Sequence, residues 1–354
     1  MRRTGPIDRK ERQPEGHRAF LSQASKATVL AIAILWPCFS TFDALAAPQR
    51  SGWLPRWGAS AVLLRDGTLL MTGGFNGQDV GTTEIFDPAS RTWKQEKPDP
   101  HPRTSANAAL LPDGSVLVTG GYDGTYLNAT ERFDPVHRQW QNVSEAPVPR
   151  AGAVSVRLGN GDIFVSGGFN DSGYLSSTVA FVPDSGTWKE LAPDPLARWS
   201  AAGTLLSSGK VLVTGGYNGN NLGNTEVYSP DTNTWKTVAP DPVPRWGAVA
   251  VRLPSGKVLV VGGYQESYMG TAETYDPDHD LWKKVSPDPV PRERASGVLL
   301  PDGTILLLGG LNAGGFPENA ERYFPKTGRW KILIFRNSPL SGTKRLTTGH
   351  GTPS

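Results

Sequence analysis

The sequence predicts an all-β repeat protein, and three observations carry this prediction. A glycine pair recurs six times along the 354-residue chain, and a tryptophan follows each pair at a nearly constant distance. The intervals hold short apolar runs bounded by Gly, Pro, Asp and Asn, and no segment of the repeat region has helical periodicity. Self-similarity with a period of this length is typical of a solenoid, a propeller or an array.

The two series of residues define six copies of one unit. The glycine pairs are spaced by 47, 47, 48, 47 and 47 residues, and the tryptophans by 47, 48, 47, 47 and 48. The pairs are Gly73-Gly74, Gly120-Gly121, Gly167-Gly168, Gly215-Gly216, Gly262-Gly263 and Gly309-Gly310, and the tryptophans are Trp93, Trp140, Trp188, Trp235, Trp282 and Trp330. Because the two series interleave with one period, we expect the units to form a single body.

Each unit is expected to contain four strands, which we name A to D in chain order. In the second unit the first three fall at 106–111, 115–121 and 130–135, and Trp140 opens the fourth. A glycine in the A–B turn supplies the positive φ of a tight hairpin. Strand B is apolar on both faces, and the glycine pair ends it where a side chain would prevent two backbones from approaching closely. Each tryptophan is expected to pack between adjacent sheets.

The order of these elements resembles the kelch motif. Each unit runs through Pro-Arg, an apolar strand, an Asp-Gly or Ser-Gly turn, a strand ending in Gly-Gly, a Thr-Glu-x-Tyr/Phe-Asp-Pro segment and Trp, over roughly residues 55 to 335. The turn is similar to that of galactose-oxidase-like kelch repeats. The resemblance implies a β-propeller of four-stranded blades, and the six units imply six blades. The third unit departs from the pattern at Val179 and Val182, the sixth at Phe324, and the fourth has Ala197 in place of the proline before Arg198.

The chain divides into a leader, a repeat region and a tail. Residues 1–46 look like a signal peptide cleaved after Ala46 or Ala47, because basic residues precede an apolar run, 27–39, that is too short to span a membrane. The alternative is an uncleaved anchor. The propeller is expected at 47–336 and a flexible tail at 337–354. The repeats are expected at about 55–101, 102–148, 149–196, 197–243, 244–290 and 291–336.

Charge and cysteine content restrict the function. The leader holds seven Lys/Arg and four acids, which accounts for the whole net charge of +3, so the remaining residues, 47–354, are neutral together and the repeat region carries no basic footprint for nucleic acid. The single cysteine, Cys38, lies in the leader, so the mature chain would have no disulfide and no thiolate ligand or nucleophile. We expect a secreted or periplasmic protein that acts as a monomer.

The strand order predicts which face of the propeller binds. In an antiparallel unit strand B ends where strand A begins, so the B–C loops and the D–A connections share one face, which we name the loop face. The D–A connections place there Arg56, Arg103, Arg150, Arg198, Arg245 and Arg292, and the B–C loops place there Phe75, Asn76, Tyr122, Asp123, Phe169, Asn170, Tyr217, Asn218, Tyr264 and Gln265. Guanidinium, amide and aromatic groups suit a protein, peptide or glycan ligand. The alternative for the arginines is an architectural role, since all six units repeat them.

Residues that occur in only some of the units are stronger candidates for function than the repeated ones, because the symmetry of the fold does not require them. Trp57, Trp199 and Trp246 follow the arginine in units one, four and five only, and exposed tryptophans would form a binding hot spot. The alternative is packing against the next blade. The other unit-specific candidates are Glu266, Glu293, Arg294, Tyr126, Tyr174, Tyr268 and Phe316.

Catalysis has less support in the sequence. The four histidines outside the leader are scattered without metal-ligand spacing, so we expect no metal and no cofactor. Copper-radical chemistry of the galactose-oxidase kind needs a cysteine linked to a tyrosine, which the mature chain lacks. The alternative function is a sugar-modifying enzyme similar to periplasmic kelch sialic-acid mutarotases, in which Glu293, Arg294 and Glu266 would transfer protons and bind a carboxylate.

Overall fold

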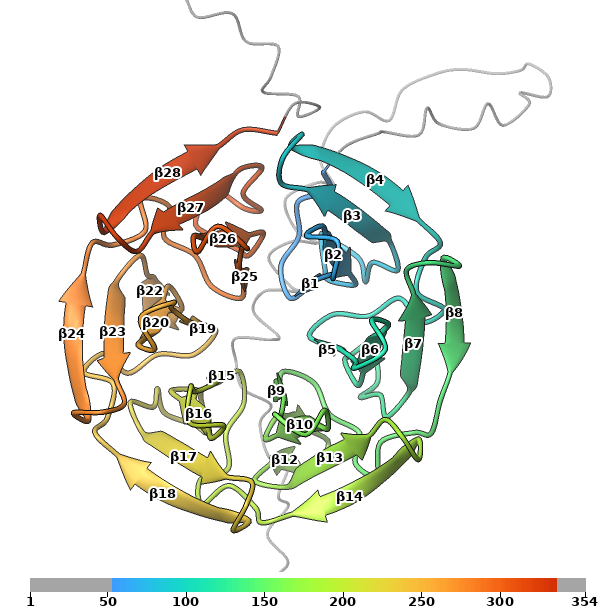
Figure 1. Ribbon diagram of the computed structural model, residues 1–354, viewed down its shortest axis with the longest axis horizontal. Helices are drawn as coiled ribbons and strands as arrows, with labels where there is room; N and C mark the ends of the chain where they lie inside the picture. The colour runs from blue at the N-terminus through green and yellow to red at the C-terminus, as the bar shows by residue number, and fades with distance from the viewer. Residues whose placement is uncertain (1–52, 336–354) are drawn as a thin grey trace, which may run out of the picture. The chain divides into compact units, whose positions relative to one another are not determined.

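The computed structural model describes residues 53–335, which form a six-bladed β-propeller (Figure 1). Six four-stranded antiparallel sheets stand around a central axis, and each is built from one contiguous unit without exchange of a terminal strand. The predicted fold class is confirmed. Within the described range no helix is long and apolar enough to span a bilayer. The predicted leader and tail lie outside the described residues.

The strands occupy equivalent places in every blade. The innermost strands, A, are β1 (Ser60–Leu63), β5 (Asn107–Leu110), β9 (Val154–Arg157), β15 (Ala202–Leu205), β19 (Val249–Arg252) and β25 (Ser296–Leu299). The B strands are β2 (Leu69–Thr72), β6 (Val116–Thr119), β10 (Ile163–Ser166), β16 (Val211–Thr214), β20 (Val258–Val261) and β26 (Ile305–Leu308). The C strands are β3 (Thr83–Asp87), β7 (Thr130–Asp134), β13 (Thr178–Val182), β17 (Thr225–Ser229), β23 (Ala272–Asp276) and β27 (Ala320–Phe324).

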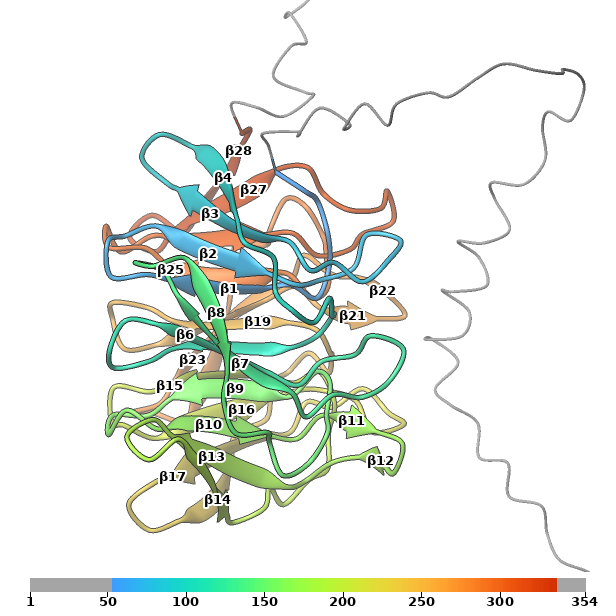
Figure 2. The ribbon, with the colours of Figure 1, turned by 90° about the vertical axis from the view of Figure 1, so that its right-hand side faces the viewer.

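The outer strands and two short hairpins complete the blades. The D strands are β4 (Thr92–Glu96), β8 (Gln139–Asn142), β14 (Thr187–Leu191), β18 (Thr234–Val238), β24 (Leu281–Val285) and β28 (Arg329–Leu333). The hairpins lie in the B–C loops of the third and fifth blades and pair β11 (Phe169–Asn170) with β12 (Gly173–Tyr174), and β21 (Tyr264–Gln265) with β22 (Ser267–Tyr268). Figure 2 shows both hairpins at the same end of the propeller.

The core lies between neighbouring blades. Every B strand is fully buried, as its apolar sequence predicts. Between the first and second blades, for example, Val62 and Leu70 pack against Val116 and Val118. Each blade thus buries its two faces against two neighbours, which is how a propeller forms one body from repeats that have no core of their own.

The glycine pairs mark the contact between one blade and the next. A Cβ on Gly120 would lie 2.6 Å from the carbonyl oxygen of Arg150 in the following blade, and Gly120 has a φ of +69°. The N–H of Gly121 donates to that same carbonyl at 2.8 Å. The other five pairs repeat this geometry. Glycine is required because a side chain would push the blades apart, which confirms the prediction that backbones approach closely here.

The tryptophans of strand D also join blades. Trp140 packs on Phe133 of its own blade with ring centroids 5.1 Å apart, and its indole N–H donates to the Lys97 carbonyl of the preceding blade at 3.0 Å. The equivalent tryptophans of blades three to six make the same bond. The predicted packing between adjacent sheets is confirmed.

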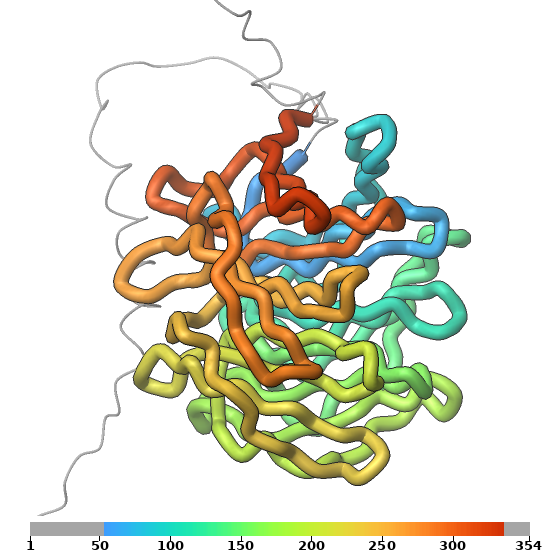
Figure 3. Tube along the Cα trace, turned by 60° about the vertical axis from the view of Figure 1, so that its left-hand side comes forward, coloured from blue at the N-terminus to red at the C-terminus, as the bar shows by residue number. Residues whose placement is uncertain are grey.

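An aromatic cluster closes the ring between the sixth and first blades, which lie side by side (Figure 3). Trp53 precedes the first unit and packs against Trp93, with centroids 4.6 Å apart, and against Phe335 at 5.4 Å. The N–H of Gly310 donates to the carbonyl of Arg56 as at every other junction. Two aromatic side chains from opposite ends of the described chain therefore replace the terminal strand exchange of other propellers.

Candidate functional site

The loop face is assembled from one D–A connection and one B–C loop in each blade. The residue after the repeated arginine pairs with the first residue of the B–C loop, as in the bridges of Trp57 with Phe75 and of Trp246 with Tyr264. The two segments therefore lie side by side, as the strand order predicts.

A closed belt of six backbone hydrogen bonds surrounds the axis at this face. Each belt residue donates its N–H to the carbonyl of the belt residue in the preceding blade, at 2.7–3.2 Å, and all six have φ between +49° and +66°. The belt residues are Gly58, Ser105, Gly152, Ser200, Gly247 and Arg294. Because the last bond runs from Gly58 to Arg294, the belt joins all six blades and fixes the backbone on which the neighbouring side chains stand.

The six repeated arginines lie beneath the loop face rather than on it. Their side chains are only 0–2% exposed. Arg103 donates to Asp99 at 2.9 Å, to Glu131, and to the carbonyl of Gly120. The sequence led us to expect a ring of guanidinium groups exposed for ligand binding, and their burial corrects this expectation. Contacts inside the blades occupy all six side chains: Arg56, Arg103, Arg150, Arg198, Arg245 and Arg292.

The carboxylate partners of these arginines were missed in the sequence. Blades two, four, five and six place an aspartate four residues before the arginine and a glutamate on strand C beside it. The recurring Pro-Asp-Pro and Thr-Glu segments carried the signal. In the third blade Ala146 and Val179 occupy both acidic positions, and Arg150 instead donates to the carbonyls of Gly167 and Ser177, each at 2.9 Å. Burial lowers the pKa of Arg150 to about 10.

The residues that break the repeat meet at the axis. The guanidinium carbon of Arg294 lies 4.6 Å from the ring centroid of Trp57, 4.2 Å from that of Trp199 and 5.1 Å from that of Trp246. Blades one and four stand opposite each other in a ring of six, so a group that touches Trp57 and Trp199 lies near the centre. We name these four side chains the axial plug. The three tryptophans and Arg294 were each predicted from broken symmetry, and cation–π contacts bring them together.

Glu293 lies beside the plug in a buried setting. Glu293 is only 7% exposed, and its Oε2 has no hydrogen-bond partner among the described residues. Burial raises the pKa of Glu293 to about 7, although the charge of Arg294 opposes the shift. Burial, together with the charges of Glu293 and Tyr264, raises the pKa of Tyr268 to about 12. Glu266, the third residue of the enzyme hypothesis, lies exposed in the turn between β21 and β22.

Aromatic side chains of the B–C loops form a continuous arc across blades two to four. Successive ring centroids lie 5.0–5.9 Å apart. The arc runs through Tyr122, Tyr126, Phe169, Tyr174 and Tyr217, and we name it the aromatic arc. A second series, Trp199, Trp246, Tyr264 and Tyr268, crosses blades four and five with spacings of 5.3 Å. The loop aromatics are all partly exposed.

One of the amide side chains predicted for the loop face makes a hydrogen bond within the propeller, and the others are partly exposed. Asn170 uses its amide to donate to the Pro149 carbonyl at 2.9 Å. Asn76, Asn218 and Gln265 are partly exposed at the starts of their loops, and Asp123 is exposed. The loop face thus combines aromatic, amide and carboxylate groups around a tryptophan-lined centre.

Comparison with known proteins agrees with this architecture. The KLHDC2/KLHL20/DRC7 Kelch-repeats domain matches residues 94–241, and the Kelch motif matches residues 248–289. The chain is a kelch-repeat β-propeller. Among solved structures, the one titled "Structure of YjhT" is 18% identical, covers 80% of this chain and 99% of its own, and superposes with a TM-score of 0.68. That likeness concerns the fold of the kelch propeller. No curated protein matches the sequence.

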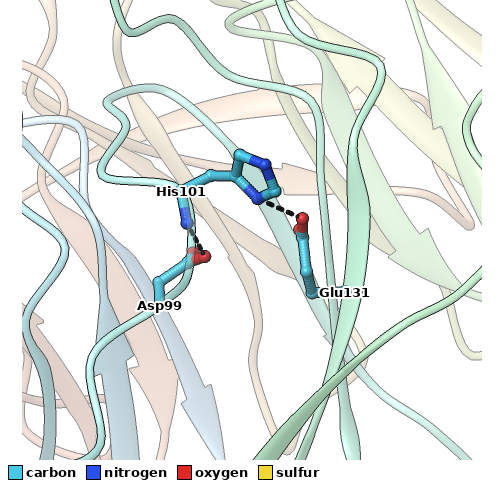
Figure 4. A group of neighbouring side chains, drawn as sticks. All are labelled: Asp99, His101 and Glu131. Carbon is cyan, nitrogen blue, oxygen red and sulfur yellow. Dashed lines mark hydrogen bonds and ion pairs between the residues drawn. The ribbon is translucent and has the colours of Figure 1, made fainter.

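One cluster in the kelch propeller offers metal-ligand atoms (Figure 4). His101 places its Nδ1 2.6 Å from an oxygen of Glu131, and its backbone N–H donates to Asp99 at 3.0 Å. Both carboxylates are also ion-paired with Arg103. The guanidinium therefore already supplies the positive charge that a cation would bring, and the cluster is better suited to holding the arginine than to binding a metal.

Proposed function

We propose that this kelch propeller is a binding module whose loop face takes up a protein, peptide or glycan ligand. The observation that carries the proposal is the convergence of unit-specific side chains on one face. The two aromatic series provide partly exposed rings, and the amides and carboxylates of the same loops provide hydrogen bonds. Trp57 of the axial plug is buried, so it supports the face and is not an exposed anchor. Binding hot spots have this composition, with aromatic anchors inside a polar rim. On the evidence of its leader, we also propose that the protein is exported.

The test uses tyrosines that only some units carry. Peptides selected from a displayed library, and glycans on an array, would first identify a ligand for the wild-type chain. The variant Tyr126→Ala/Tyr174→Ala/Tyr268→Ala is then expected to bind that ligand at least tenfold more weakly, since aromatic hot-spot residues each contribute more than about 1 kcal/mol. The matched control removes three exposed apolar side chains elsewhere, as Val136→Ala/Leu281→Ala/Ile332→Ala. Equal affinity of the two variants would overturn the assignment of the loop face.

A second candidate function rests on one observation, the buried Glu293 beside Arg294. A carboxyl whose pKa is about 7 can give and take a proton near neutral pH, as a sugar-modifying enzyme requires. NMR exchange measurements on a panel of acidic sugars test this function. Accelerated anomer exchange that Glu293→Gln abolishes would support it, and unchanged exchange for every sugar would exclude it for the panel.

A further inference from the structure

The charge of the B–C loops has one sign. The six loops between strands B and C contain five acidic residues and no Lys, Arg or His. The acids are Asp79, Asp123, Asp171, Glu266 and Glu318. Residues 53–335 contain 25 Lys/Arg and 29 Asp/Glu, a net charge of −4, and five of the six D strands carry a lysine at the same register. The B–C loops, with a charge of −5, are therefore the negative part of a propeller whose net charge is −4.

Three of the acids stand along the aromatic arc. Asp79 and Asp123 are close enough for the charge of Asp123 to add to burial in raising the pKa of Asp79 to about 6. Asp171 is near Tyr126, whose pKa is raised to about 12 by burial and by the charges of Tyr122 and Asp171. The three carboxylates thus lie in the B–C loops of blades one to three, and the rings of the aromatic arc lie in those of blades two to four. We name these acids and the aromatic arc together the acidic arc.

Two carboxyl groups at this face have oxygen atoms without a partner. Glu293 is more than nine-tenths buried, and its Oε2 accepts no hydrogen bond from any described residue. Asp79, half-buried in its loop, likewise has an unpartnered Oδ1. Glu293 lies on the D–A connection of the sixth blade, and its charge reaches Tyr268 in the B–C loop of the fifth. Buried acceptors without donors are rare in folded proteins, and a ligand that donates hydrogen bonds would satisfy them.

The cations of the propeller itself are not available to neutralise these acids. Arg294 is held among three tryptophan rings, and the repeated arginines are buried beneath the face. Apart from these arginines, the basic residues of the described D–A connections are Lys97, which is exposed, and His101, which is partly exposed, and neither is ion-paired with Asp79, Asp123 or Asp171. The contact of Arg294 with the tryptophans also illustrates, within this protein, how flat rings on the face accept a guanidinium group.

We infer that the ligand of the loop face is a cationic peptide segment, rich in arginine or lysine, which lies along the acidic arc. Carboxylates would pair with its charged ends and the tyrosine rings would stack on its guanidinium groups. This inference rests on the proposed function and names the chemistry of the ligand. It selects a basic peptide over a glycan or an acidic peptide, because a neutral sugar would leave the acids unpaired and an acidic chain would be repelled.

The experiment measures fluorescence anisotropy of two labelled ten-residue peptides, one alternating arginine with glycine and one alternating glutamate with glycine. The full chain is expected to bind the arginine peptide, and the variant Asp79→Asn/Asp123→Asn/Asp171→Asn to bind it about tenfold more weakly, since each exposed charge pair changes affinity by up to a few-fold. Asparagine keeps the shape of each side chain. The control Asp184→Asn/Asp231→Asn/Asp278→Asn removes the same charge from exposed C–D turns and is expected to bind within twofold of wild type.

The outcomes separate this inference from the proposed function. Equal weakening by the two triple variants would show that only net charge matters, and tighter binding of the glutamate peptide would contradict the inference directly. If the arginine peptide fails to bind while a library-selected ligand is lost in the tyrosine variant, the inference falls and the binding function stands. If no ligand depends on those tyrosines, both fall. Urea unfolding of each variant checks that it folds.

Discussion

Two adjacent positions on every D–A connection have opposite roles. The arginine is repeated in all six blades and is buried, whereas the next residue is tryptophan in three blades and threonine, alanine or glutamate in the others. The arginine makes hydrogen bonds or ion pairs within each blade, so its replacement would destabilise the unit that carries it. The following residue stands on a backbone that the belt already fixes, so it is free to differ. In this propeller, the residues repeated in every blade stabilise the fold, and the residues that differ between blades lie at the face that we propose to bind a ligand.

The third blade sharpens the comparison, because it keeps the arginine and lacks both acids. Arg150 bonds only to neutral groups, whereas Arg245 in the fifth blade lies between Asp241 and Glu273. The architectural position therefore tolerates the loss of its carboxylates more readily than the loss of its guanidinium. In blades two to six the arginine donates to the carbonyl of the first glycine of the pair, whether or not the carboxylates are present.

The largest effect is expected from Arg245→Met. The substitution leaves the carboxylates of Asp241 and Glu273 buried without a counterion, which costs about 3–5 kcal/mol of unfolding free energy. Arg150→Met leaves no buried acid and should cost less than half as much. Urea unfolding of the two variants measures the difference, and equal losses would show that the carbonyl bonds, not the ion pairs, dominate.

A smaller effect is expected from the pH dependence of Glu293. Its pKa is raised from 4.5 to about 7 in the folded state, so its stabilising contribution is complete below pH 4.5 and is lost as the pH rises to 7. The shift corresponds to about 3 kcal/mol. Between pH 4.5 and 8 the wild type should therefore lose more stability than Glu293→Gln, by up to that amount. Parallel pH profiles for the two proteins would contradict the buried, unpartnered state of this carboxyl.

The belt gives a third prediction. Gly152 has a φ of +64°, and a Cβ there would lie 2.5 Å from Nε1 of Trp199. Gly152→Ala should therefore cost about 2 kcal/mol through backbone strain and displacement of the axial plug. Ser200→Ala is the matched control, because that belt position already carries a side chain at a φ of +55°. If thermal unfolding shows the same small change for both variants, the belt does not constrain the plug.

The sequence predicted the propeller well because its signals are local and repeated. A glycine pair, an Asp-Gly turn and a tryptophan recur six times, and each reports a contact that its own unit makes with a neighbour. The belt could not be predicted, because a serine such as Ser105 or an arginine such as Arg294 gives no indication in the sequence that its φ is positive. The burial of Arg198 was left open because an arginine in a loop connection is equally compatible with a surface position and an internal one. Its partner Glu226 lies 28 residues away, and only the fold brings the two together.

The candidate site was predicted in its members but not in its arrangement. The positions at which the repeat is broken predicted the residues of the axial plug. Nothing in the sequence indicated that these side chains contact one another. Their contact depends on the ring geometry, which places blade one opposite blade four. Closure by Trp53 and Phe335 was equally invisible, because both residues lie outside the repeated pattern.

One paired measurement in the fifth blade tests the central claim most directly. For Arg245→Met and Tyr268→Ala, unfolding free energy and affinity for the selected ligand are both determined. The account predicts that Arg245→Met lowers stability by about 3 kcal/mol or more and that its folded fraction binds normally, whereas Tyr268→Ala stays within about 1 kcal/mol of wild type and binds several-fold more weakly. The reverse pattern, with binding lost at the repeated arginine and stability lost at the unit-specific tyrosine, would contradict it.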